Sequence, residues 1–140
     1  MTEHRQMQIG EVAERTGLSL RTIRHYEEVG LVIPSARSKG GFRLYTAADV
    51  DRLMVIRRMK PLDFSLDEMR DLLDITDRLA ASDDAPTGED RARLRERLAS
   101  YREVADARCE TLRARLAMAE DFAATLRQRL ENESGRLTQR

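Results

Sequence analysis

The chain has 140 residues, enough for one ordinary domain or one small domain with an extension, which excludes a large enzyme with separate cofactor and substrate domains. One cysteine and two histidines exclude an intramolecular disulfide framework and the metal or iron–sulfur sites that need several cysteines from one chain. The sequence has no apolar run of about 18 residues and no secretory signal, so we expect a soluble protein of the reducing cytoplasm, without membrane contact.

Charge is distributed unevenly along the chain. The 25 basic and 25 acidic residues cancel, and taken over the whole chain this neutrality argues against non-specific binding of nucleic acid. Residues 1–60, however, hold 11 basic and 7 acidic groups, residues 61–90 hold 2 and 10, and residues 91–140 hold 12 and 8. This asymmetry predicts a basic working surface near the N-terminus, followed by an acidic connector.

Two short helices are predicted at the start of the chain. Apolar residues at i, i+3 and i+4 from Ile9 indicate an amphipathic helix that stops at Gly17. Ser19 is a predicted N-cap, and the second helix runs from it to about Val29. Because so few residues separate them, the two helices predict a helix-turn-helix.

A small hairpin, or wing, is predicted next. Residues 35–41 are rich in turn formers, and apolar Phe42 and Leu44 then alternate with Arg43 and Tyr45. The alternation predicts that Arg43 and Tyr45 lie on the outward side of the wing.

Two capping boxes open the next helices. Thr46 pairs with Asp49 in the first box, and Ser65 pairs with Glu68 in the second, while Pro61 breaks the chain between them. The predicted helices cover residues 47–60 and 66–75, and residues 83–88 form a linker.

One long helix is predicted for residues 90–132, which contain no proline or glycine. It would be about 64 Å long, too long for any core that this chain could build. Apolar residues at steps of three and four predict a coiled-coil seam and a homodimer; the alternative is that the helix folds back on its own N-terminal domain. The predicted seam comprises Leu98, Tyr101, Ala105, Cys109, Leu112, Leu116, Ala119, Ala123, Leu126 and Leu130.

The second helix carries the residues best suited to reading DNA. At 100° per residue, Arg21, Arg24, His25 and Glu28 share one polar face, whereas Leu20, Ile23 and Tyr26 lie toward the other. The major groove accepts such a helix, since each arginine can donate two hydrogen bonds to guanine. A solvated helix face is the alternative, and the neighbouring capped helices and basic wing argue against it.

The wing adds further basic groups. Arg43 and Tyr45, with Lys39 and Arg37 nearby, suit phosphate oxygens.

Four ordered segments resemble the DNA-binding domain of MerR-family transcriptional regulators: Ile9–Ser19, Thr22–Leu31, Gly41–Tyr45 and Phe64–Met69. The resemblance covers about residues 7–75. The long helix is also similar in layout to the antiparallel dimerisation helix of that family.

The resemblance implies a dimer on a pseudo-palindromic operator at the bacterial nucleoid, bending and untwisting promoter DNA to favour RNA polymerase. The fold it implies is mainly α, with a winged helix-turn-helix domain and an antiparallel coiled-coil helix. Arg24, Arg43 and Tyr45 match DNA-contacting positions of the family. The predicted DNA-binding residues are Ser19, Arg21, Thr22, Arg24, His25, Tyr26, Lys39, Arg43, Tyr45 and Ser65. The predicted organisation is a DNA-binding domain of residues 1–76, an acidic connector of residues 77–89, the dimerisation helix of residues 90–132 and a tail of residues 133–140.

Two departures from the family pattern bear on DNA contacts. His25 stands where the family usually has an aromatic residue, so one backbone contact is changed or is made by the imidazole. Asp63 stands where the family usually has glycine, beside an atypical Pro61, which puts a phosphate contact of this loop in doubt. Ser65 can still present backbone N–H groups to a phosphate.

The effector is the least determined feature. Metal-sensing relatives use clustered cysteines near the end of the long helix, and residues 110–140 contain none, so we expect no metal and no cofactor. A small molecule in a groove between the long helix and residues 62–88, or a thiol-reactive agent at Cys109, remains open. In an antiparallel pair the two copies of Cys109 lie near the dyad and permit an interchain disulfide; the alternative is a small hydrophobe buried on the seam.

The leading hypothesis is therefore a dimeric, sequence-specific transcriptional regulator. A coiled-coil adaptor whose small domain binds protein is the alternative. We expect no enzyme and no catalytic residues, because the chain assembles no nucleophile, base and orienting group at a defensible spacing and has no phosphate-binding glycine loop.

Overall fold

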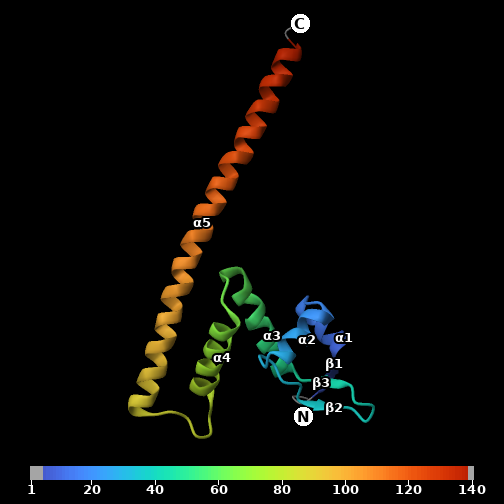
Figure 1. Cartoon of the computed structure of the whole chain (residues 1–140), viewed down its shortest axis with the longest axis vertical. Coiled ribbons are helices and arrows are strands. Elements are labelled where there is room, and N and C mark those ends of the chain that lie inside the picture. The colour runs from blue at the N-terminus through green and yellow to red at the C-terminus, as the bar shows by residue number, and fades with distance from the viewer. Residues whose placement is uncertain (1–4, 139–140) are drawn as a thin grey trace. The chain divides into compact units, whose positions relative to one another are not determined.

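The computed structural model describes residues 5–138, and its internal contacts divide the chain into two compact units, Met1–Arg95 and Glu96–Arg140. The first unit contains, in chain order, β1 (Met7–Gln8), α1 (Ile9–Thr16), α2 (Leu20–Glu28), β2 (Ala36–Arg37), β3 (Arg43–Tyr45), α3 (Ala47–Met59), the 3-10 turn η1 (Lys60–Leu62) and α4 (Leu66–Ala80) (Figure 1). The last helix, α5 (Gly88–Thr138), begins in the first unit and continues through the second.

Helices α1 and α2 form the predicted helix-turn-helix. Helix α1 ends at Gly17, whose φ of 72° lies in the left-handed region and whose N–H bonds the carbonyl of Ala13. The buried Thr16 donates from Oγ1 to the carbonyl of Val12 at 2.8 Å. Ser19 then caps α2, because its Oγ accepts the N–H of Thr22 at 3.0 Å.

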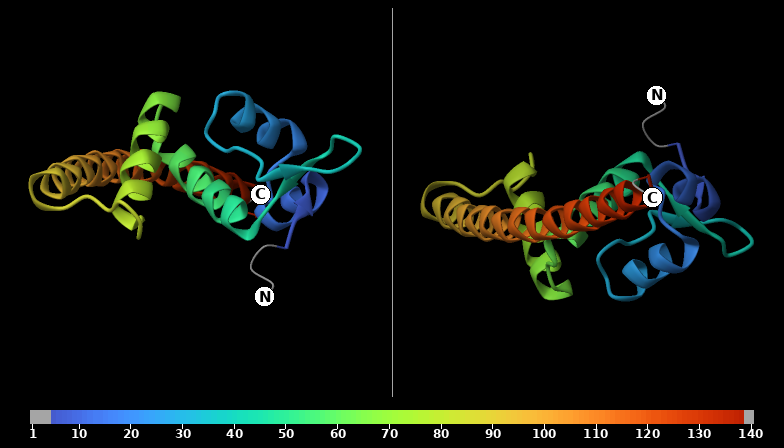
Figure 2. Two further views of the ribbon diagram at one scale, coloured as in Figure 1. Left: turned by 90° about the horizontal axis from the view of Figure 1, so that it is seen from below. Right: turned by 90° about the horizontal axis from the view of Figure 1, so that it is seen from above.

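The wing is part of a three-stranded antiparallel sheet of order β1-β3-β2. The sequence predicted the hairpin of β2 and β3, with Ala36 opposite Leu44, but not the pairing of Met7 with Tyr45. Two residues of β1 are too few for an alternation signal. The loop between β2 and β3 projects from the helices of the first unit (Figure 2).

Both predicted capping boxes are formed. Asp49 accepts the N–H of Thr46 at 2.9 Å, and Glu68 accepts the N–H of Ser65 at 2.8 Å. Helix α4 extends to Ala80, beyond the predicted end at residue 75, since no glycine or proline stops it there. The first unit closes over a core of apolar side chains from its helices and from the segment after α2, including Val12, Ile23, Leu31, Val32, Leu53, Ile56, Met69, Leu73 and Ile75.

Helix α5 has 51 residues, a length of about 76 Å, and exceeds the predicted range at both ends. Gly88 starts it and Gly135 lies within it, because a glycine costs only about 1 kcal/mol where strong helix formers follow. Most of the predicted tail is thus helical, while residues 139–140 lie outside the described range.

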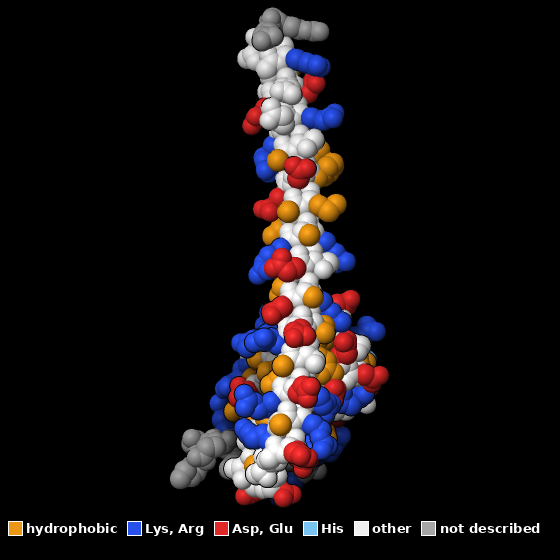
Figure 3. Space-filling view, turned by 90° about the vertical axis from the view of Figure 1, so that its left-hand side faces the viewer, with side chains coloured by type: hydrophobic (Ala, Val, Ile, Leu, Met, Phe, Trp, Pro, Cys, Tyr) orange, Lys and Arg blue, Asp and Glu red, His pale blue; other side chains and the backbone are white. Residues whose placement is uncertain are grey.

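Large apolar side chains stay exposed along the second half of α5 (Figure 3). They are Leu112, Leu116, Met118, Phe122, Leu126, Leu130 and Leu137. Within residues 5–138, none of the helices combines the length and the apolar character needed to span a bilayer.

Candidate nucleic-acid interface

Helix α2 presents one polar face to solvent. Arg21, Arg24 and His25 are exposed, whereas Ile23 and Tyr26 are buried against the core. The phasing from the sequence is confirmed at these five positions. It was wrong for Leu20, which is 40% exposed, because at 100° per residue this side chain lies about 60° from Ile23 and about 120° from Tyr26, at the edge of the buried face.

A cleft of about 480 Å³ joins this face to the connection between α3 and α4. It is lined by Arg21, Thr22, His25, Tyr26, Lys60 and Leu66. Arg21 and Lys60 bring two cationic groups from separate elements to one hollow, beside an imidazole, and such a hollow suits a phosphate.

Lys60 was missed by the sequence interpretation. Two features of the sequence could have indicated it: Lys60 is one of only two lysines in the chain, and it directly precedes Pro61. Only the fold brings it to α2, because Lys60 lies far from Arg21 and Thr22 in the chain and yet lines the same cleft.

The N-terminus of α4 borders the same cleft. The Oγ of Ser65 accepts the N–H of Glu68 at 3.1 Å, so the Ser65 side chain is engaged in capping. The N–H groups of Leu66 and Asp67 have no acceptor within the helix, as in any first turn. They are the groups of α4 that suit an anion.

Three wing residues converge on one carboxylate of α2. The Nε of Arg43 donates to Glu27 Oε1 at 2.7 Å, and the hydroxyl of Tyr45 donates to Oε2 at 3.0 Å. The Nη2 of Arg37 lies 3.8 Å from Oε1. The Glu27 side chain is only 14% exposed.

The pKa values of Arg43 and Tyr45 are both raised in the folded protein. The hydrogen bond from Arg43 to Glu27 raises the pKa of the guanidinium, as does the charge of that carboxylate. Burial, with the hydrogen bond to Glu27 as a second cause, raises the pKa of Tyr45 to about 12.

The predicted outward position of Tyr45 is wrong. Its side chain is fully buried, and only its hydroxyl reaches Glu27. Alternation predicted the opposite face because tyrosine was counted as polar, although its ring packs in a core as readily as phenylalanine. Phe42, by contrast, is 64% exposed in the projecting loop, directly before β3.

The other predicted DNA-binding residues lie at different depths. Arg43 is half-buried, and Lys39, in the projecting loop, is exposed together with Ser19 and Ser65. Tyr26 is buried, and this burial raises the pKa of its hydroxyl.

Two arginines from other helices hold the C-terminal end of α2. Arg52 of α3 donates from Nε to the carbonyl of Leu31 at 2.7 Å and pairs with Asp77 of α4, also at 2.7 Å. Arg70 of α4 donates to the carbonyl of Val29. The acceptors are the C-cap residue of α2 and a residue of the segment that follows it, so these bonds fix the path of the chain as it leaves α2.

The predicted seam residues of α5 fall into two groups. Leu98, Tyr101, Ala105, Cys109 and Ala123 are half-buried, whereas Leu112, Leu116, Ala119, Leu126 and Leu130 are exposed. Cys109 is a free thiol.

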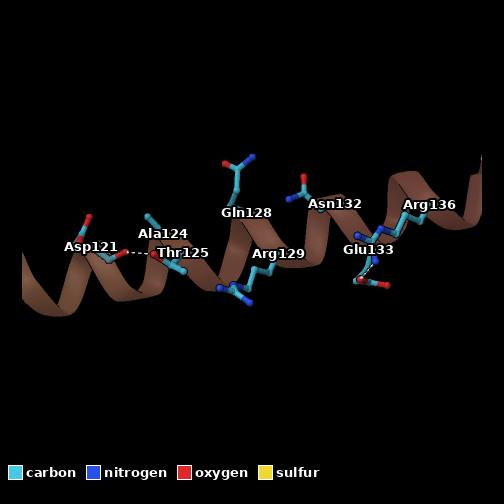
Figure 4. A pocket seen from close by; sticks show the side chains of 8 residues that line it. All are labelled: Asp121, Ala124, Thr125, Gln128, Arg129, Asn132, Glu133 and Arg136. Carbon is cyan, nitrogen blue, oxygen red and sulfur yellow. Dashed lines mark hydrogen bonds and ion pairs between the residues drawn. The ribbon is translucent and has the colours of Figure 1, made fainter.

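A second hollow, of about 810 Å³, follows α5 away from the seam (Figure 4). Its lining comes from this helix alone: Asp121, Ala124, Thr125, Gln128, Arg129, Asn132, Glu133 and Arg136. In Figure 4 Gln128 and Asn132 point to one side and Arg129 and Glu133 to the other, so no groups converge on a common point. It is the solvated face of the helix. Among residues 5–138 no three His, Cys, Asp or Glu side chains are grouped as metal ligands would be.

The fold defines a winged helix-turn-helix protein, with a capped second helix, an exposed basic face and a wing bonded to that helix. A family model described as "MerR HTH family regulatory protein" matches residues 7–75, and one described as "MerR, DNA binding" matches residues 50–129. The chain belongs to the MerR family.

Its relatives differ in length. It is 36% identical over 126 residues to the HTH-type transcriptional activator TipA of Streptomyces coelicolor, a match that covers 90% of this chain and 42% of TipA. The chain thus spans about two fifths of that relative.

Solved structures share the fold. The regulator PbrR691 from Ralstonia metallidurans CH34, in complex with lead(II), has 30% identity and a TM-score of 0.54, over 86% of this chain and 82% of that one. HiNmlR, a MerR family regulator lacking the sensor domain and bound to promoter DNA, has 21% identity and a TM-score of 0.64, over 84% and 80%, and shows the fold alone.

Proposed function

We propose that the chain is a dimeric, sequence-specific DNA-binding transcriptional regulator of the bacterial cytoplasm. The observation that carries this proposal is the exposed basic face of α2, which lines a cleft together with Lys60 and the N-terminus of α4. Membership of the MerR family supports it.

Recognition is divided between bases and phosphates. Arg21 and Arg24 enter the major groove and donate to guanine, each good pair being worth about 1–3 kcal/mol of discrimination. Lys60, Lys39 and the first-turn N–H groups of α4 take phosphates, with Arg43 on the wing. His25 lies on the reading face with Arg21 and Arg24, and Ser19 and Thr22 border it. The imidazole of His25 makes the backbone contact that an aromatic residue usually makes in the family.

Dimerisation supplies the second half-site. The exposed leucines of α5 need a partner, and a second copy packed antiparallel along the same seam covers them. Two recognition helices then meet the duplex on one face, about 34 Å apart or a multiple of that distance.

Promoter control follows the mode implied by the family. The dimer bends and untwists promoter DNA and so favours transcription by RNA polymerase. Flexible base steps in the operator lower the deformation energy of the DNA. A small molecule or a thiol-reactive agent at Cys109 is the effector class that fits this chain.

The test is selection of bound duplexes from a random pool, followed by affinity measurements across salt concentrations. We expect log affinity to fall with log salt by about 0.9 per phosphate contacted. Arg24→Ala should lose discrimination between bases at one position of the operator. Arg129→Ala, on the solvated face of α5, should leave this discrimination intact. A flat salt response, or equal selection by wild type and Arg24→Ala, favours the adaptor alternative.

A further inference from the structure

The geometry points to Glu27 as a positioning residue of the DNA-binding surface, which locks the wing to the recognition helix and holds Arg43 ready for a phosphate. Its role rests on the proposed function, since DNA is the ligand that the positioned arginine would meet. Glu27 was not among the residues predicted to act on DNA, because acids repel phosphates.

The carboxylate is the junction of three elements. Arg37 belongs to β2, Arg43 and Tyr45 belong to β3, and all three approach the single side chain of Glu27 on α2. The Glu27 side chain is 14% exposed and accepts hydrogen bonds from two donors. The bond from Arg43 is charge-assisted, and little water competes for it at this depth.

The sheet alone is too small to orient the wing. Its strands have two or three residues, well below the five or six that are about typical, so backbone pairing contributes little rigidity. The bonds to Glu27 therefore fix the angle between the wing and α2.

The contact also orients the guanidinium of Arg43. Its hydrogen bond and its closest ion-pair contact both use Nε, and the terminal nitrogens of a guanidinium carry four further donors. Holding Nε limits the rotamers of the side chain, so less conformational entropy is lost when a phosphate binds.

The neighbouring acid provides a matched control. Glu28 is exposed at the next position of α2 and carries the same charge toward any bound DNA. Charge alone predicts that neutralising either acid strengthens DNA binding, whereas a positioning role predicts that Glu27→Gln weakens binding and Glu28→Gln does not.

The experiment measures operator affinity of Glu27→Gln and Glu28→Gln at one salt concentration. We expect Glu28→Gln to bind as tightly as wild type or a few-fold tighter, and Glu27→Gln to bind about tenfold more weakly, the loss of one charge-assisted bond. In an Arg43→Ala background, Glu27→Gln should add no further loss.

A readout without DNA separates this role from the proposed function. The ultraviolet titration of Tyr45, isolated by difference from Tyr45→Phe, should shift to lower pH in Glu27→Gln. Equal affinities of Glu27→Gln and Glu28→Gln, or an unshifted tyrosine titration, overturn the role of Glu27.

If wild type binds no duplex, the proposed function fails, and the positioned Arg43 then has no phosphate to bind. If Glu27→Gln is unfolded by circular dichroism, Tyr45→Phe, which removes one bond to Glu27 and keeps Arg43, takes its place and must weaken binding.

Discussion

The Nη1 of Arg57 donates a hydrogen bond of 2.8 Å to the carbonyl oxygen of Thr16. Arg57 belongs to α3 and Thr16 is the last residue of α1, so a side chain from a third helix closes the turn of the helix-turn-helix. The guanidinium also lies over Gly17, where an added Cβ would approach Nη1 to 3.4 Å.

Arg57→Ala should destabilise the first unit. The carbonyl of Thr16 loses a charged donor, and we expect the free energy of unfolding to fall by about 1–2 kcal/mol. Urea denaturation followed by circular dichroism measures it. Arg58→Ala removes the adjacent exposed arginine and should change the midpoint little, so equal effects of the two variants would contradict the assignment.

Asp63 should be replaceable by glycine but not by valine. Its φ of 58° is left-handed, a conformation that glycine adopts freely and β-branched residues resist. We expect Asp63→Val to be less stable than Asp63→Gly by about 1–2 kcal/mol. Thermal unfolding compares them, and a stable Asp63→Val would show that the loop can leave this conformation.

The seam of α5 should control oligomeric state. Leu116→Glu places a charge on the exposed apolar stripe, and we expect the dissociation constant of the dimer to rise about a hundredfold or more. Gln128→Glu adds the same charge on the solvated face and should leave the dimer intact. Sedimentation equilibrium distinguishes the variants, and dissociation by Gln128→Glu would instead place the interface on that face.

Stability should fall at alkaline pH through Tyr45. Its pKa is raised from 10.0 to about 12 in the folded state, so the unfolded chain releases its proton first as pH rises. The stabilisation is complete below pH 10 and is lost between about pH 10 and 12. Urea unfolding across that interval should show a steeper decline for wild type than for Tyr45→Phe, and parallel declines would contradict it.

Local signals predicted the local structure well. Ser19, the two capping boxes and Gly17 act within a few residues of themselves, so their hydrogen bonds appear where the sequence placed them. The buried and exposed faces of α2 follow from helical periodicity, apart from Leu20.

Long-range pairing decided the rest. Met7 pairs with Tyr45, and Lys60 lines one cleft with Arg21. Glu27 accepts hydrogen bonds from the wing. Each of these contacts joins residues that are far apart in the chain. Tyr45 illustrates the reason, since a residue with an apolar ring and a polar tip is assigned to a face only by what covers it.

By itself the sequence determined the order of helices, the wing, the family and the apolar stripe of α5, because caps, turn formers and periodicity are local physical constraints. Only the tertiary structure decided which side chains meet: Arg57 with Thr16, and Arg43 and Tyr45 with Glu27. Such contacts depend on how separate elements pack in three dimensions, and no periodicity within either element encodes its partner.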